Sequence, residues 1–130
     1  MISSQTLALL NTDIGALEFY GKSNRIPKAV RDVLTKAVSL RNEMTDTQRQ
    51  IEERRRQVND ITTEQTRIRE NIKTVDRTSE YATRLLKKLN DQETTIEKLQ
   101  SEIATLQKQF EQQQKNFEAY LQNTSVDDKQ

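Results

Sequence analysis

Apolar residues recur with a heptad period along two stretches of the chain, which a short polar break separates. With Val30 at heptad position a, every a and d position up to Val75 is apolar except Thr47, Arg54 and Gln65. Helices with this repeat pack against a partner along a narrow seam formed by the a and d side chains. The first stretch therefore predicts one long coiled-coil helix.

A second heptad series runs from Ala82 to Tyr120, with polar interruptions at Gln92 and Gln113. The break before it contains Thr and Ser, which favour the N-terminus of a helix because their hydroxyls accept hydrogen bonds from its first amides. Two long helices joined by a few residues fold back on each other or continue as one rod. We predict an all-α antiparallel coiled-coil hairpin with helix 27–75, turn 76–80, helix 81–121 and a frayed tail at 122–130.

One register of the two helices brings the polar interruptions together. It places Gln65 opposite Gln92, Ile51 opposite Leu106 and Leu40 opposite Phe117. It also sets Ala37 against Tyr120 and Thr47 against Phe110, so that small side chains face large ones. Two interpretations of the Gln65–Gln92 layer have equal weight. The layer sets register and orientation at some cost in stability, or a partly wet seam simply tolerates glutamine.

The first 26 residues form a lead-in to the hairpin. We expect residues 13–20 to form a short helix, because Thr12 or Asp13 can cap its N-terminus and Gly21 can end it. We also expect this helix to pack at the open end of the hairpin. Residues 5–10 form a strand-like run, which a frayed terminus explains equally well.

Aromatic residues gather at the same open end of the predicted hairpin. They form either a small local core or an aromatic docking patch, through which this end contacts a larger body. The aromatic docking patch comprises Phe19, Tyr20, Phe117 and Tyr120.

Composition agrees with a narrow seam better than with a thick core. Only 32% of residues are hydrophobic, whereas 32% are charged, and the formal net charge is +1. A chain so close to neutrality has no long-range field that would attract nucleic acid or an anionic membrane. No apolar run is long enough to span a membrane, so we expect no membrane insertion.

Candidate catalytic chemistry is sparse. The chain has no His and no Cys, which removes the commonest general base, the thiol nucleophile and the usual zinc ligands. Two helices also leave little room for a ligand-sized cavity. The tightest basic run, at residues 54–56, directly follows Glu52 and Glu53, which favours a neutralised helix face. We therefore expect no enzyme activity, no cofactor, no metal site and no nucleic-acid partner.

Two segments carry a resemblance to bacterial proteins of the mucoidy-inhibitor-A-like family, whose function is unknown. Residues 64–103 resemble that family's C-terminal helical region, and residues 16–38 are similar to its lead-in. Here Ile26 precedes Pro27, where the family often has a Ser-Pro pair. The resemblance implies that this chain is the terminal part of a larger bacterial protein. It also implies that residues 6–10 are the last strand of a preceding β-rich domain.

These patterns together predict a non-catalytic protein–protein interaction module or structural spacer. A self-associating homodimer, in which two hairpins form a four-helix bundle, is the first alternative. Nucleic-acid binding through residues 54–56 and through Lys87 and Lys88 is the weaker one.

Overall fold

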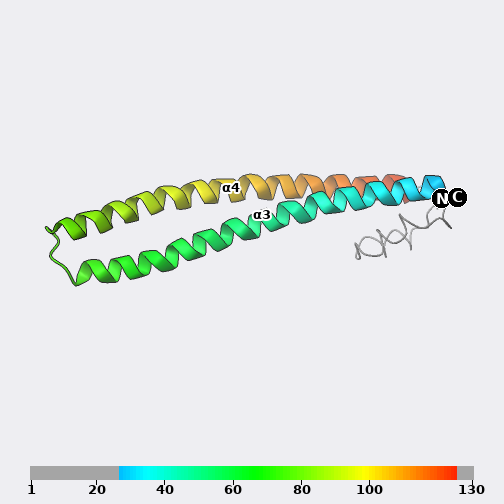
Figure 1. Cartoon of the computed structure of the whole chain (residues 1–130). Helices are drawn as coiled ribbons and strands as arrows, with labels where there is room; N and C mark the ends of the chain where they lie inside the picture. Colours follow the sequence, from blue (N-terminus) through cyan, green and yellow to red (C-terminus); the bar gives the residue numbers. More distant parts are fainter. Residues whose placement is uncertain (1–26, 126–130) are drawn as a thin grey trace. The chain divides into compact units, whose positions relative to one another are not determined.

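The described part of the chain consists of two long helices. The computed structural model describes residues 27–125, in which helix α3 spans Lys28–Lys73 and helix α4 spans Glu80–Ser125 (Figure 1). No strand occurs among these residues. The prediction of an all-helical hairpin, in which two long helices pack against each other, is confirmed for this part of the chain. The predicted short helix at 13–20 and the strand-like run at 5–10 lie outside it.

Helix α3 begins directly after Pro27, the only proline of the chain, whose fixed φ suits the start of a helix. The Pro27 carbonyl accepts a hydrogen bond from the Arg31 amide at 3.0 Å. At the other end, the Thr74 amide bonds the Asn71 carbonyl at 3.2 Å. This spacing of three residues tightens the backbone, as is common where a helix ends. The helix consequently ends at Lys73, two residues before the predicted position 75.

The turn is held by side chains that satisfy backbone groups. The Asp76 carboxylate accepts hydrogen bonds from the Thr78 amide at 2.9 Å and from the Thr78 hydroxyl at 2.8 Å. Ser79 caps α4, because its hydroxyl accepts a hydrogen bond from the Ala82 amide at 3.1 Å. Glu80 then places a negative charge in the first turn of α4, where the helix dipole favours it.

Helix α4 continues past its predicted end. It includes residues 122–125, which we expected to fray. The Thr124 hydroxyl donates to the Tyr120 carbonyl at 2.7 Å, within the last turn. Residues 126–130 of the predicted tail lie outside the described residues.

Contacts within the chain divide it into two units. Unit 1 contains the described residues 27–47 and 109–125, and unit 2 contains residues 48–108. Each unit therefore combines a part of α3 with a part of α4. All predicted a and d positions from Val30 to Tyr120 are buried or partly buried, so the heptad pattern identifies the seam in both units.

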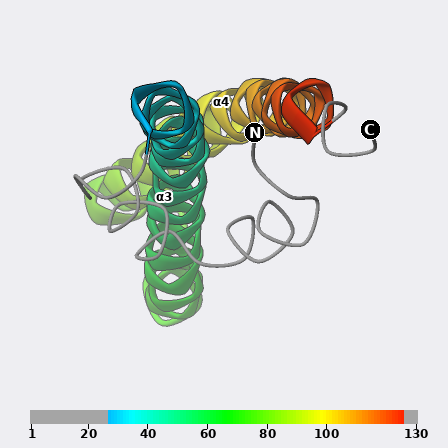
Figure 2. The ribbon, with the colours of Figure 1, turned by 90° about the vertical axis from the view of Figure 1, so that its right-hand side faces the viewer.

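Unit 1 contains the start of α3 and the end of α4, which lie at the same end of the helices in both views (Figures 1 and 2). Its core includes two residues outside the predicted seam, Leu34 and Leu121. Both follow a d position directly, so here the apolar stripe covers the a, d and e positions, as on helices with a broader buried face. The buried core of unit 1 consists of Leu34, Ala37, Met44, Phe117 and Leu121.

Unit 2 has a seam that alternates between apolar and polar layers. Ile51 and Leu106 are buried on opposite helices, and Ile68 of α3 and Ala82 of α4 are also buried. Between such layers lies the buried polar side chain of Gln65. The polar layers of unit 2 provide the first candidates for a functional site.

Candidate interaction surfaces

The first candidate is the predicted glutamine layer of unit 2. Gln65 is only 3% exposed, and its Nε2 donates a hydrogen bond to Oε1 of Glu93 at 3.0 Å. The same carboxylate lies 3.9 Å from Arg69. Oε1 of Gln92 is buried and has no hydrogen-bond partner among the described residues. Both glutamines therefore lie in the seam, but the partner of Gln65 is the glutamate next to Gln92 and not Gln92 itself.

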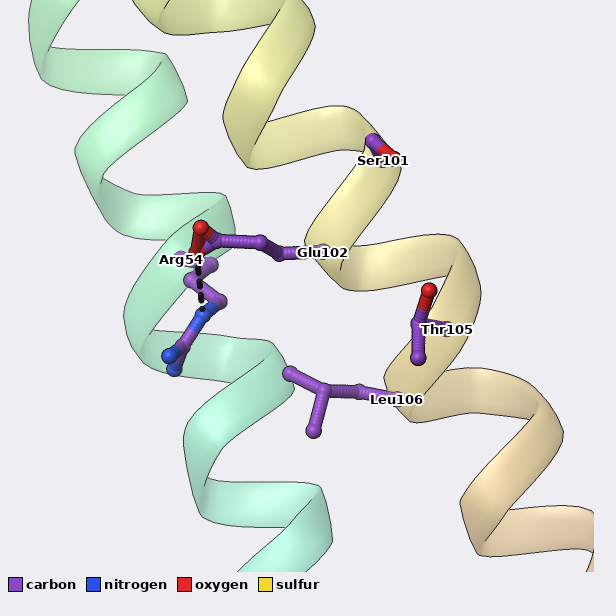
Figure 3. Close-up of a pocket in the computed structure, with 5 residues that line it drawn as sticks. All are labelled: Arg54, Ser101, Glu102, Thr105 and Leu106. Atoms are coloured by element: carbon purple, nitrogen blue, oxygen red, sulfur yellow. Dashed lines mark hydrogen bonds and ion pairs between the residues drawn. The ribbon is translucent and has the colours of Figure 1, made fainter.

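A second polar layer lies around Arg54. Its Nε forms an ion pair with Oε1 of Glu102 at 3.1 Å, and its Nη1 donates to the Gln50 carbonyl at 3.3 Å. Figure 3 shows the two side chains reaching toward each other from α3 and α4. Arg54 occupies a d position, so Glu102 provides the partner that its charge needs beside an apolar seam. The pair joins the two helices.

These contacts also agree with the predicted register within unit 2. That register places Arg54 opposite Ile103, and its ion-pair partner is the preceding residue, Glu102. It places Gln65 opposite Gln92, and the observed partner is the following residue, Glu93. A shift by one heptad would separate both pairs by about two helical turns.

A groove of about 240 Å³ adjoins the Arg54–Glu102 pair. Two hydroxyls, those of Ser101 and Thr105, line it together with the apolar side chain of Leu106 (Figure 3). A hydroxyl becomes a nucleophile when a nearby base accepts its proton. The charged groups in the lining are Arg54 and the Glu102 carboxylate that it binds.

The third candidate is a larger groove beside the turn, of about 340 Å³. We call it the turn groove. Its floor and walls are mainly apolar, with two arginines among the lining side chains. The turn groove is lined by Arg69, Ile72, Arg77, Ala82, Leu86 and Leu89.

Two large hydrophobic side chains are exposed at this end of unit 2. Tyr81 is 49% exposed and Leu86 is 52% exposed, although both lie on a helix whose seam positions are covered. Leu86 directly follows Leu85, which occupies a d position. The heptad pattern places Leu85 in the seam, whereas Leu86 occupies an e position, about which that pattern makes no prediction. The consecutive leucines were the sequence signal for a second apolar face.

Most acidic groups near the turn already have partners. Glu64 binds Lys88 across the hairpin at 2.6 Å, and this hydrogen bond lowers the pKa of the Glu64 carboxyl. The hydrogen bonds from the amide and hydroxyl of Thr78 lower the pKa of Asp76. Glu80 pairs with Arg84 at 3.1 Å. By contrast, no ion pair of Arg77 occurs among the described residues.

The aromatic docking patch falls partly inside the described residues. Phe117 is only 1% exposed and belongs to the core of unit 1, and the Arg41 guanidinium lies 5.7 Å from the centre of its ring. The Tyr120 hydroxyl donates to the Val33 carbonyl at 3.5 Å. Burial raises the pKa of Tyr120, and the nearby charge of Asp32 adds to this effect. Phe19 and Tyr20 lie outside the described residues. Phe117 therefore has almost no surface to offer a partner in this conformation.

The basic clusters have internal partners. Arg55 pairs with Glu52 at 2.9 Å, while Lys87 pairs with Asp91 at 3.0 Å. Together with the pairs of Arg54 and Lys88 described above, four of the five basic residues in these two clusters lie beside a carboxylate.

Within residues 27–125, no group of three or more acidic or other ligand side chains is arranged to hold a metal ion. Neither α3 nor α4 contains a segment that is long and apolar enough to cross a membrane. Comparison with known proteins found no matching family model, no similar curated protein and no similar solved structure.

Proposed function

We propose that the chain is a non-catalytic protein–protein interaction module, in which the hairpin acts as a spacer and the turn end carries the contact surface. The observation that carries this proposal is the exposure of Tyr81 and Leu86 beside the turn. Large hydrophobic side chains that remain exposed can mark binding sites, and aromatic residues are enriched among the side chains that dominate binding energy. The resemblance at residues 64–103 adds that the hairpin belongs to a larger bacterial protein.

The distribution of polar chemistry supports a binding role. Catalysis needs a nucleophile or an acid–base group in a site that excludes water. The hydroxyls of Ser101 and Thr105 lie beside a carboxylate that an arginine already neutralises. The polar side chains of the seam instead connect α3 with α4, which suits a spacer that must keep its two helices in register.

Site-specific photo-crosslinking in the cell of origin tests this proposal. A photoreactive phenylalanine analogue replaces Tyr81 in one variant and the exposed Thr95 in a control variant. We expect discrete adducts with another protein from position 81 and none from position 95. Equal labelling from both positions, or none from either, would contradict a contact surface at the turn.

Self-association is distinguished by mass. Sedimentation equilibrium at micromolar concentration gives a mass near 15.2 kDa if the module is monomeric and twice that value for a homodimer. We expect the monomer. A dimer whose photo-crosslinks join two copies of position 81 would replace the proposal by the four-helix bundle.

A further inference from the structure

We propose that the turn groove binds an acidic amphipathic helix of a partner protein. This inference rests on the proposed function, because it assigns a chemical class to the partner of the turn end. It is carried by three features of unit 2: an apolar floor, two arginines at that floor and the lack of local acids available to neutralise both of them.

The floor of the turn groove has helical spacing. Ala82, Leu86 and Leu89 follow each other at intervals of four and three residues, so they lie on one face of α4. Ile72 of α3 completes the apolar surface. Ala82 is fully buried and has only a methyl group, so the surface is depressed between larger neighbours. A depression of about 340 Å³ accommodates a few apolar side chains from another protein.

The two arginines give the turn groove a positive charge. Arg77 forms no ion pair among the described residues, and the nearest carboxylate in sequence, Asp76, is held by the amide and hydroxyl of Thr78. Arg69 lies 3.9 Å from Glu93, and both side chains are more than half exposed. An ion pair this exposed contributes little free energy, so a better-placed carboxylate of a partner can replace Glu93 beside Arg69. A guanidinium binds a carboxylate through two parallel hydrogen bonds, which favours an acidic partner.

The secondary structure of the groove indicates the form of the partner. Both walls are helices whose backbone amides and carbonyls are bonded internally, so a bound peptide cannot extend a sheet. Recognition must therefore use side chains, and an amphipathic helix presents apolar anchors at intervals of three and four residues. Acidic residues that flank those anchors would face Arg69 and Arg77.

Two other classes of partner fit less well. Polybasic segments that hold anionic membranes carry about four to eight Lys or Arg residues, whereas two arginines line the turn groove. The same face of a second copy would bring arginines against arginines. Sedimentation with lipid vesicles tests the first case, and the sedimentation-equilibrium mass described above tests the second.

Selection from a displayed library of random 16-residue peptides tests the inference on the whole chain. We expect enriched peptides to combine Asp or Glu with apolar residues at helical spacing. A synthetic peptide of the consensus sequence, labelled with fluorescein, should then bind the chain in an anisotropy titration. Its affinity should fall roughly tenfold or more with Arg77→Glu and with Leu86→Ser.

The matched control is Arg56→Glu, because Arg56 is exposed on α3 and no ion pair of it occurs among the described residues. This variant carries the same change in charge and should bind like the unmodified chain. Circular dichroism melts of all three variants establish that they fold. If Leu86→Ser fails this check, Leu86→Gln replaces it.

Each other outcome overturns the inference. These outcomes are no enrichment, enrichment of basic peptides, or equal binding to the Arg77→Glu chain. Sedimentation with phosphatidylglycerol vesicles that depends on Arg77 would assign the groove to a lipid surface. If acidic peptides fail while position 81 still forms specific photo-crosslinks, the inference fails and the interaction module stands. If both fail, the proposed function fails as well.

Discussion

The two units use the same heptad repeat in different ways. Unit 1 packs an apolar core that includes Leu34 and Phe117, with exposed fractions of 2% and 1%. Its two polar seam residues, Thr47 and Gln113, form no hydrogen bond between the helices, because the Thr47 hydroxyl bonds the Glu43 carbonyl of α3 and the buried Oε1 of Gln113 has no described partner. Unit 2 inserts charged and amide side chains into its seam and connects its helices through Arg54–Glu102, Gln65–Glu93 and Glu64–Lys88. Burial of apolar surface contributes much free energy but depends little on which residues face each other. A polar contact contributes less, but it forms only when its two partners are placed opposite each other. The difference suggests that unit 1 supplies stability and that unit 2 supplies register and contact chemistry.

The largest effect should come from removing an aromatic ring in unit 1. Phe117→Ala should lower the free energy of unfolding by about 3–5 kcal/mol, the usual cost of removing a buried Phe side chain. The matched change in unit 2 is Leu99→Ala, which should cost about 2 kcal/mol because its seam is narrow and can collapse. Urea denaturation measures both values. An equal loss, or a larger one for Leu99→Ala, would contradict the division between the units.

The seam glutamines offer the next largest effect. Replacing Gln92 by Leu removes a buried carbonyl oxygen without a described partner, so stability should rise by about 1 kcal/mol. Replacing Gln65 as well removes the hydrogen bond to Glu93. If these residues set the register, the double variant should be more stable but should also populate other registers.

Disulfide trapping measures which register is populated. Because the chain contains no native cysteine, only the introduced cysteines can form a disulfide. In the predicted register, Ile61→Cys forms a disulfide with Ile96→Cys, whereas a shift by one heptad pairs it with Leu89→Cys. We expect only the first disulfide in the parent chain and both in the double glutamine variant. The first disulfide alone in both chains, without new oligomers, would mean that the seam merely tolerates glutamine.

Much of the fold was predictable because the seam is a local pattern. A heptad repeat repeats the same constraint at every turn of both helices, so single exceptions such as Gln113 do not hide it. The helix ends were less accurate, because they depend on a few hydrogen bonds. The amide of Thr74 bonds Asn71, and this contact ended α3 before its apolar pattern ended at Val75.

The contact chemistry was harder to predict because it depends on positions beside the seam. The ion pair of Arg54 required a residue at position g of α4, which the pairing of a and d positions does not describe. The turn groove required three residues that occupy no a or d position: Arg69, Arg77 and Leu86. A helical wheel that retained every apolar residue would have shown Leu34 and Leu86 as extensions of the stripe.

A smaller effect should come from the ion pair of Arg54 with Glu102. Their side chains are 28% and 34% exposed, so solvent screens the attraction and the coupling energy should be about 0.5 kcal/mol. A double-mutant cycle with Arg54→Met and Glu102→Gln measures it. The exposed Glu70–Lys73 pair provides the control and should couple more weakly. If the two couplings are equal, the cross-helix pair contributes no more to the hairpin than a surface contact.

The smallest effects should be those of pH, and they should have opposite signs in the two units. The pKa of Glu64 is lowered by its hydrogen bond with Lys88 in unit 2, so the unfolded chain binds a proton there more readily than the folded chain. This stabilisation is present above the ordinary carboxyl pKa of about 4 and is lost as the pH falls through the folded value. The pKa of Tyr120 in unit 1 is raised by burial. Its contribution is present below the ordinary tyrosine pKa of about 10 and is lost as the pH rises through the folded value.

Urea denaturation from pH 2.5 to 5 and from pH 9 to 11 separates these contributions. Glu64→Gln should flatten the acid side of the stability profile and leave the alkaline side unchanged, whereas Tyr120→Phe should do the reverse. Asp76→Asn serves as the acid control, because the pKa of Asp76 is also lowered but its hydrogen bonds lie within the turn and do not cross between the helices. Hydrogen exchange should then show that acid loosens unit 2 before unit 1. If acid instead loosens both units together, the polar contacts between the helices of unit 2 do not determine where the hairpin opens first.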